Sequence, residues 1–383
     1  MAEQKLKKKN KWLNPKGTGG IDIVFLILVL CLLAFGLVMV ASSSYVAALY
    51  KYGDSYHYIT RQLIFAVAGI VVMLAVPLFD YKLFRKLAPI LLVISVIMLA
   101  LVLIPGIGIK VNGARRWLGV GSLRFQPSEV AKLAIIMVFS SYMAANYKRM
   151  KEPKVGILMP AVVLLLVCGL VAVETHVSGA ILIFAVGAVM IFVGGASMKW
   201  FFGIGGAGAA ALAGFAILTP YAKGRIDTWL NPFDDPTGAG FQTIQSLYAI
   251  GSGGPLGLGL GQSRQKYLYI PEPQNDYIFS IVCEELGFIG AMMVIVLFVL
   301  LIWRGFVIAY HAKDKFGSLL VVGIISRVAI QTILNIAVVT NSIPPTGISL
   351  PFFSYGGTAL LMLLFEMGIV LAVSRHSRME TSE

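Results

Sequence analysis

The sequence predicts an all-α integral membrane protein with about ten transmembrane helices. Of its 383 residues, 58% are hydrophobic and only 13% are charged, a composition that soluble globular domains do not have. Apolar runs of about 20 residues, the length that crosses a bilayer as a helix, recur along nearly the whole chain. The charges lie in the short connectors between these runs and in the N-terminal tail. A soluble domain with a single membrane anchor is therefore excluded.

The apolar runs divide the chain into a basic tail (1–20), one membrane domain (21–374) and a short C-terminal tail (375–383). The first run is too long for the apolar core of a cleaved signal peptide, so we expect it to remain as the first span. A long connector, 220–275, precedes the eighth span. The expected spans are 21–46, 59–78, 87–105, 129–146, 156–173, 178–194, 200–219, 276–303, 316–341 and 355–374.

Positive charge in alternate connectors predicts the orientation in the membrane. Every connector on the same side as the N-terminal tail carries Lys or Arg, and such connectors stay in the cytoplasm. Both termini are therefore expected to be cytoplasmic. The net charge of +13 follows from this pattern, and no nucleic-acid partner is expected. The residues concerned are Lys82, Arg85, Lys86, Lys148, Arg149, Lys151, Lys154, Lys199, Arg304, Lys313, Lys315, Arg375 and Arg378.

Two loops on the opposite side, 106–128 and 220–275, are also basic. Cations on the translocated side oppose the usual bias, which suggests that an anionic ligand binds there. The alternative is simple tolerance, because long loops are translocated largely regardless of their charge. The cations that could clamp phosphate oxygens are Arg115, Arg116, Arg124, Arg264 and Lys266.

The longer basic loop contains a predicted helix and a glycine-rich segment. Residues 241–250 have the pattern of a short amphipathic helix at the membrane interface. The glycines of 251–261 either let backbone N–H groups approach a phosphate or permit a tight path of the chain. No βαβ unit surrounds this segment, which excludes a dinucleotide-binding fold.

Asp276 follows two prolines and opens the eighth apolar run. A carboxylate in this place is either a helix N-cap or a functional acid at the membrane face. Glu284 lies eight residues further, about 12 Å along a helix, so the two carboxylates cannot form the pair that a glycosidase uses.

Ionisable residues inside the spans need partners, because an unpaired charge in hydrocarbon is costly. Ion pairs such as Arg327 with Glu366 or Glu285 are expected. Arg327, Gln331 and Asn335 recur every four residues, which places them on one helix face that should look into the bundle.

The three cysteines, at 31, 168 and 283, lie in apolar runs without paired spacing. They predict neither a disulfide framework nor a metal site.

Three stretches carry a recognisable pattern. The first is Gly-Ala-Arg-Arg-Trp-Leu at 113–118 with Phe-Gln-Pro-Ser-Glu-Val-Ala-Lys-Leu at 125–133. The second runs from Asn-Pro at 231 to Glu-Glu-Leu-Gly at 284–287, and the third is Pro-Thr-Gly-Ile-Ser-Leu-Pro-Phe-Phe-Ser-Tyr-Gly-Gly at 345–357. Together they resemble the SEDS family (shape, elongation, division and sporulation), specifically its FtsW and SpoVE branch.

This resemblance implies a peptidoglycan glycosyltransferase that polymerises lipid II outside the cytoplasmic membrane. It also implies as partners a class B penicillin-binding transpeptidase and other division or sporulation membrane proteins. Asp276 matches the family's essential catalytic acid. Two departures, Gln274-Asn275 for His-Thr and Thr175-His176-Val177-Ser178 for Pro-Asp-Leu-Gly, favour a sporulation-type or Gram-positive member over an elongation protein. The motifs imply as substrate-binding residues Arg115, Arg116, Arg124, Gln126, Ser128, Glu129, Gln245, Ser246, Arg264, Lys266, Ser354 and Tyr355.

In the implied reaction Asp276 deprotonates the acceptor hydroxyl, which requires partial burial to raise its proton affinity. We hypothesise that Lys132 pairs with Asp276 at rest and moves to the pyrophosphate when substrate binds. Ser128 is expected to cap its helix, and 349–357 either shapes the outer cavity or only breaks the backbone before the last span. No cofactor is certain, and Mg²⁺ or Mn²⁺ is an open alternative. A lipid II flippase and a scaffold without chemistry are the competing functions.

Overall fold

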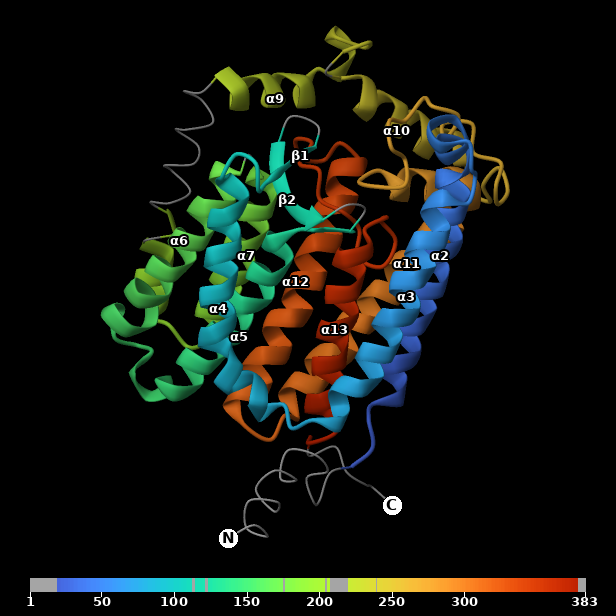
Figure 1. Ribbon diagram of the computed structural model, residues 1–383. Helices are drawn as coiled ribbons and strands as arrows, with labels where there is room; N and C mark the ends of the chain where they lie inside the picture. Colours follow the sequence, from blue (N-terminus) through green and yellow to red (C-terminus); the bar gives the residue numbers. More distant parts are fainter. Residues whose placement is uncertain are drawn as a thin grey trace.

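The computed structural model describes residues 19–111, 114–120, 123–174, 176–203, 205–206, 220–238 and 240–377. Long helices run side by side between two ends of a bundle (Figure 1). The all-α polytopic prediction is confirmed, and the span expected at 200–219 falls mostly outside the described residues. Among the described residues, eight helical segments are long and apolar enough to cross a membrane: α2 (Ile23–Tyr52), α3 (His57–Ala75, continued by a 3₁₀ turn to Leu78), α4 (Lys82–Leu103), α5 (Pro127–Ala145), α6 (Met159–Val173, preceded by a π turn from Lys154), α11 (Ile278–Tyr310), α12 (Lys315–Val339) and α13 (Gly357–Ser374). A shorter apolar helix is α7 (Val177–Val193).

The helices α5, α12 and α13 form the centre of the bundle. In α5 and α12, 72% of the residues in an 18-residue apolar stretch are buried, against 22% in α4. The central helices therefore face protein, and the outer helices present apolar side chains outward, as helices that face lipid do. The central helices carry four buried ionisable groups, with which other protein groups can pair: Glu129, Lys132, Arg327 and Glu366.

Both described ends of the chain lie at one end of the bundle, which we call the tail end (Figure 1). The N–H of Gly19 donates to the carbonyl of Arg375 at 3.0 Å, and Arg304 forms an ion pair with Asp22 at 2.7 Å. The chain thus crosses the bundle an even number of times, which agrees with the charge pattern of the connectors.

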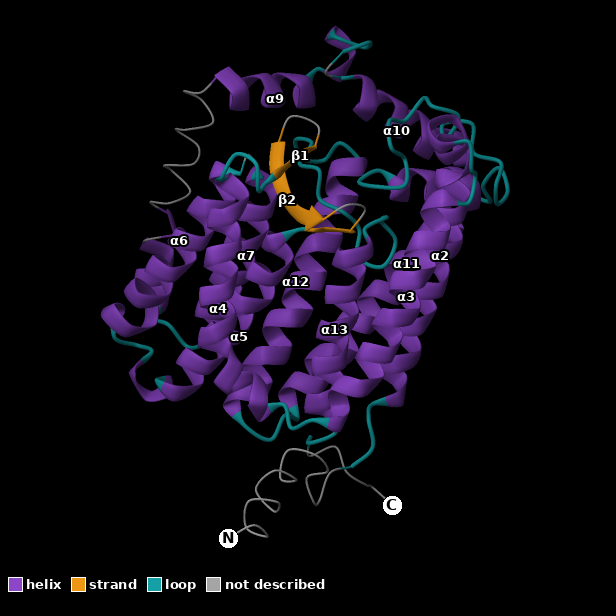
Figure 2. Cartoon of the chain, in the orientation of Figure 1, coloured by secondary structure: helices purple, strands orange, loops and turns teal. Residues whose placement is uncertain are grey.

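The opposite end, the loop end, carries most of the irregular structure (Figure 2). The first basic loop folds there into an antiparallel sheet of β1 (Ile109–Val111), β2 (Ala114–Val120) and β3 (Leu123–Phe125), which the sequence analysis did not predict. Helix α9 (Pro220–Leu230) crosses the same end, followed by α10 (Phe241–Gly253). Helix α10 is the helix predicted near 241–250.

The glycine-rich segment folds against a break in α11. The N–H groups of Leu258 and Gly259 donate to the carbonyls of Glu284 and Glu285 at 2.9 and 3.0 Å. Gly287 has φ +67°, and a Cβ added to Gly257 would overlap the Glu285 carbonyl. The glycines therefore serve a close approach of two backbones. Since these N–H groups bind α11, the phosphate-nest alternative is not supported for them.

The two adjacent glutamates of α11 hold the end of this segment. The Glu284 carboxylate accepts from the hydroxyl of Ser263 and from the N–H of Arg264. Glu285 forms an ion pair with Lys266 at 3.0 Å, and Ser42 donates to it at 2.7 Å. The expected alternative pairing of Glu285 with Arg327 is thus wrong. Lys266, expected to bind phosphate, is only 4% exposed because its ammonium serves this pair.

Candidate active site

Asp276 lies at the loop end, two residues before α11 begins at Ile278. The cap position is Tyr277, and no side chain caps the helix. Within the described residues nothing donates a hydrogen bond to the Asp276 carboxylate. The N-cap alternative for Asp276 is therefore wrong, which leaves this carboxylate without an identified structural task.

The backbone around Asp276 is held by three donors on three consecutive carbonyls. The N–H of Tyr355 donates to Gln274 at 2.8 Å, the hydroxyl of Ser354 to Asn275 at 2.7 Å, and the Asn335 amide to Asp276 at 2.7 Å. The Ser354 hydroxyl also accepts from the N–H of Leu350 at 2.7 Å. Ser354, implied as a substrate ligand, is thus engaged within the protein and positions the loop.

A second segment lies directly against the acid. Gly347 has φ +70°, and a Cβ added there would lie 3.2 Å from Oδ2 of Asp276. The preceding carbonyl, of Thr346, accepts a hydrogen bond from Ser178 of α7. The motif at 345–357 therefore does more than break the chain before α13, because it forms one wall around the acid.

The pKa of Asp276 is raised from its usual 3.8 to about 6, first by burial and then by the nearby Glu272 carboxylate. The Arg116 guanidinium opposes this rise and favours the charged form. Asp276 is therefore ionised at neutral pH and binds a proton more tightly than an exposed aspartate does. This is the perturbation that a general base requires.

Arg116 is turned toward the bundle by the alternation of β2. Successive strand side chains point to opposite faces, so Arg115 is exposed while Arg116 is partly buried. Besides Asp276, the Arg116 charge acts on two groups between α6 and α7. The pKa of Glu174 is raised by burial, against the opposing Arg116 charge, to about 8. The pKa of His176 is lowered to about 4 by burial, by the Lys132 charge and by the Arg116 charge.

Sequence reasoning missed Glu174, which is 2% exposed. Its sequence position could have pointed to it, because Glu174 ends an apolar run and lies two residues before His176. The His176 ring lies 3.3 Å from the side-chain nitrogen of Gln126, an implied substrate ligand. Gln126 and Arg116 therefore border the same polar region between the sheet and α7.

Lys132 does not pair with Asp276. Its ammonium lies 2.6 Å from Oε1 of Glu129, one turn away on α5. Oε2 of Glu129 lies 3.1 Å from Arg327, and Arg327 pairs in turn with Glu366, as expected. The resting Lys132–Asp276 pair is thus wrong, because a nearer carboxylate on the same helix takes the charge. Glu129, implied as a substrate ligand, belongs to this buried network.

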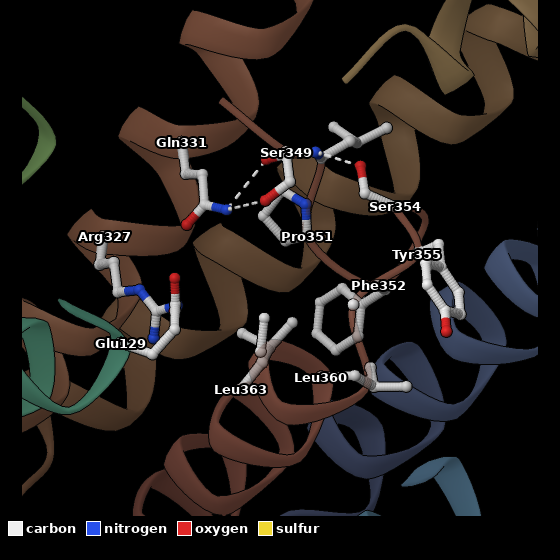
Figure 3. Close-up of a pocket in the computed structure, with 13 residues that line it drawn as sticks. Glu129, Arg327, Gln331, Ser349, Pro351, Phe352, Ser354, Tyr355, Leu360 and Leu363 are labelled. Carbon is white, nitrogen blue, oxygen red and sulfur yellow. Dashed lines mark hydrogen bonds and ion pairs between the residues drawn. The ribbon is translucent and has the colours of Figure 1, made fainter. Parts of the chain in front are cut away.

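A cavity of about 30 Å³ separates this network from the wall at 349–356 (Figure 3). Glu129, Arg327 and Gln331 lie on one side of it, and Tyr355, from the wall, lies on another. Its volume suits one or two water molecules and is far too small for a sugar. Residues of the segment 349–356 therefore line a water-sized space.

The remaining implied ligands divide by exposure. Arg115, Arg124 and Arg264 are exposed, and Gln245 is partly buried on α10. The Ser246 hydroxyl is buried and donates to the carbonyl of Val339 at 2.8 Å, so it holds α10 on α12.

Ser128 is fully buried. It does not cap α5, since the cap residue is Gln126 and Pro127 is the first helical residue. In the described part of the chain no three His, Cys, Asp or Glu side chains gather as metal ligands would.

Comparison with known proteins gives consistent matches over nearly the whole chain. A sequence model of the FtsW, RodA and SpoVE family, described as "Cell cycle protein", matches residues 22–379. Stage V sporulation protein E of Bacillus subtilis is 45% identical over 93% of this chain and 98% of its own. A protein named "Probable peptidoglycan glycosyltransferase FtsW", of Trichlorobacter lovleyi, is 42% identical over 92% and 93%.

Two solved structures share the architecture. One, titled "Structural coordination of polymerization and crosslinking by a peptidoglycan synthase complex", superposes with a TM-score of 0.77 at 30% identity, covering 94% of this chain and 99% of that one. The rod shape determining protein RodA of Thermus thermophilus superposes with a TM-score of 0.69 at 26% identity, covering 94% and 98%.

Proposed function

The chain belongs to the FtsW, RodA and SpoVE family of cell cycle proteins, and from this premise we propose that it polymerises lipid II with Asp276 as the general base. It is a multi-pass membrane protein and a peptidoglycan glycosyltransferase. The relatives' names support a role in division or sporulation. The observation that carries the proposed role of Asp276 is a carboxylate that is held through its backbone, raised in pKa and unused by the fold.

The reaction joins two lipid-linked saccharides. The hydroxyl of the acceptor sugar gives its proton to Asp276, and its oxygen attacks the anomeric carbon of the donor. The bond from that carbon to the donor's phosphate oxygen breaks as the new glycosidic bond forms, and the lipid diphosphate leaves with the bonding electrons. The proton then passes from Asp276 to solvent or to the departing diphosphate. Burial of Asp276 assists the first step because it raises the proton affinity of the carboxylate.

Arginines of the sheet are the best candidates for the diphosphate. Arg116 acts electrostatically on Asp276, and Arg115 and Arg124 are exposed on neighbouring strands. Guanidinium groups can bind phosphate oxygens bidentately. Arg264 is exposed just after the glycine-rich segment and could join them, whereas Lys266 leaves the set because it is paired with Glu285. Should Mg²⁺ or Mn²⁺ take part, substrate phosphates would supply most of its ligands, as is common for Mg²⁺.

The proposed function also includes an orientation in the membrane and a partner protein. The loop end with Asp276 faces the outside and both termini face the cytoplasm, as the positive connectors favour. The partner is a class B penicillin-binding transpeptidase. The likeness to a peptidoglycan synthase complex that combines polymerisation with crosslinking supports this partner.

The test uses the full-length chain, co-purified with its transpeptidase and reconstituted in liposomes that contain labelled lipid II. Glycan products and movement of lipid II between leaflets are measured in parallel for wild type, Asp276→Asn and, as a matched control, the exposed Asp234→Asn. A polymerase makes glycan in wild type and the control but not in Asp276→Asn. Movement of lipid II without glycan in any sample would favour the flippase, and neither activity would favour the scaffold.

A further inference from the structure

One face of α12 carries three polar side chains, each with a different task. Arg327 joins the buried ion network. One turn further, Gln331 donates to the carbonyl and hydroxyl of Ser349 at 2.9 and 3.2 Å. One more turn along, Asn335 reaches the segment that carries the acid. The inward face predicted from the four-residue spacing is confirmed, since all three side chains are buried.

The side-chain amide of Asn335 bridges two segments that are far apart in sequence. Its nitrogen donates to the carbonyl of Asp276 at 2.7 Å and to the carbonyl of Ile348 at 2.7 Å. Both acceptors are carbonyl oxygens, so the amide nitrogen must face them and the orientation of the side chain is fixed. Asn335 is fully buried, and its bond to Ile348 is buried as well.

Of the donors that hold this loop, Asn335 is the one that bonds Asp276 itself. The first of its two bonds holds the backbone of Asp276, which sets where its Cα lies. The second holds the carbonyl of Ile348, next to Gly347, where an added Cβ would lie 3.2 Å from Oδ2 of the same carboxylate. Asn335 thus fixes both the anchor of the Asp276 side chain and the wall against which its carboxylate lies.

We propose that Asn335 is the positioning residue of the general base, an inference that rests on the proposed function of Asp276. The acid belongs to a loop, and loops hold reactive groups less accurately than helices do. Asn335 transfers the rigidity of α12, a central helix of the bundle, to that loop. Losing the bridge lets the carboxylate drift by a fraction of an ångström to an ångström, and misplacement on this scale costs about 10²-fold in rate.

A residue that only stabilises the fold would give a different signature. Its loss would reduce the amount of folded enzyme, and the surviving molecules would turn over at the wild-type rate. A positioning residue instead lowers kcat of the folded enzyme at unchanged KM, because it acts on the transition state and not on substrate binding. Rates per folded molecule, with kcat and KM separated, therefore decide between the two roles.

The experiment compares Asn335→Ala, Asn335→Ser and Asn335→Asp in the full-length chain with its transpeptidase, using lipid II as substrate. The matched control is Thr332→Val, since Thr332 is also buried on α12 and its hydroxyl makes no hydrogen bond among the described residues. Folded protein is counted by size-exclusion chromatography and transpeptidase binding.

We expect kcat to fall about 10²-fold in Asn335→Ala, with KM within about twofold. Asn335→Ser, which keeps one donor, should fall less, and Asn335→Asp should fall at least as far as Ala because its carboxylate would face two carbonyl oxygens. Thr332→Val should keep the wild-type kcat. If Asn335→Ala does not fold, the milder Asn335→Ser decides the matter.

An unchanged kcat per folded molecule in Asn335→Ala or Asn335→Ser would overturn the positioning role. Asp276→Asn in the same assay separates the two proposals. If Asp276→Asn polymerises normally, the proposed function fails. If it is inactive while the Asn335 variants keep the wild-type kcat, only the positioning role fails.

Discussion

Replacing Asp276 with Asn should make the protein more stable at neutral and alkaline pH, although it removes the proposed base. The pKa of Asp276 is raised in the folded protein from 3.8 to about 6 by burial, with Glu272 adding to the rise and Arg116 opposing it. The folded state therefore holds the proton more tightly than the unfolded state. Asn has nearly the same shape and carries no charge, so it avoids the cost of burying the carboxylate.

The sign follows from proton linkage. Below pH 3.8 Asp276 is protonated in both states, and the substitution should change little. Between 3.8 and about 6 the unfolded state loses its proton first, so wild-type stability falls as pH rises. Above pH 6 Asp276 is ionised in both states, and the full free-energy cost of burying its carboxylate is present. A pKa rise from 3.8 to about 6 corresponds to a ceiling of about 3 kcal/mol. Because the side chain is partly accessible to solvent, screening should reduce the measured value to roughly 1–2 kcal/mol.

The assay is thermal unfolding of the full-length protein in one detergent at pH 4 and pH 8. The Tm of Asp276→Asn should exceed that of wild type at pH 8 by a few degrees, and the difference should shrink at pH 4. Asp234→Asn, at an exposed site, should show no such pH-dependent gain. An Asp276→Asn variant with a lowered Tm at pH 8 would mean that the carboxylate stabilises the fold, and our account of its burial would be refuted.

Three further predictions concern the same region. In a pH–rate profile, the rate of polymerisation should rise with pH through a limb near pH 6, as the Asp276 carboxylate ionises. Glu272→Gln should move that limb to lower pH, because it removes a negative charge that raises the pKa of Asp276. Gly347→Ala should lower the free energy of unfolding by about 1–2 kcal/mol and reduce kcat, since it places a left-handed Ala against the carboxylate; wild-type stability and kcat would contradict the geometry. Lys266→Met should cost about 3–5 kcal/mol of stability, because it leaves Glu285 buried without its cation. In thermal unfolding, the double variant with Glu285→Gln should recover part of that loss. Full stability of the single variant would make Lys266 a candidate phosphate-binding residue again.

The periodicity and composition of the sequence were sufficient to predict the helical bundle and the polar face of α12. The helical spans come from apolar runs about 20 residues long, and the inward face of α12 from the spacing of Arg327, Gln331 and Asn335. Both are properties of a single helix, which local sequence encodes directly. Because few opposite charges lie inside the membrane, the partner of Arg327 was narrowed to Glu366 or Glu285, and the structure has Glu366.

The ion-pair partner of a charged side chain was not predictable where several oppositely charged residues were candidates. Lys132 could meet either Asp276 or Glu129, and the i,i+3 carboxylate on its own helix takes it. Lys266 lies in a loop whose path depends on backbone hydrogen bonds to α11, so its burial beside Glu285 has no local sequence signal. The sheet at 109–125 was missed for a related reason. Its strands are three to seven residues long and read as a basic loop.

The Asp276 site combines both cases. Its place at a membrane face follows from the end of an apolar run, and the family resemblance singles out the acid. The donors that hold its loop come from 335, 354 and 355, some 60 to 80 residues away. Such contacts exist only once the helices have packed.

The most direct test of the central claim is the rate of glycan polymerisation by Asp276→Asn, measured at pH 7.5 on the intact complex with its transpeptidase. Our account predicts a fall of at least about 10²–10⁴-fold, the contribution typical of a general base, in a protein that still binds its partner and unfolds at a temperature no lower than wild type. Polymerisation at the wild-type rate by this variant would contradict the account.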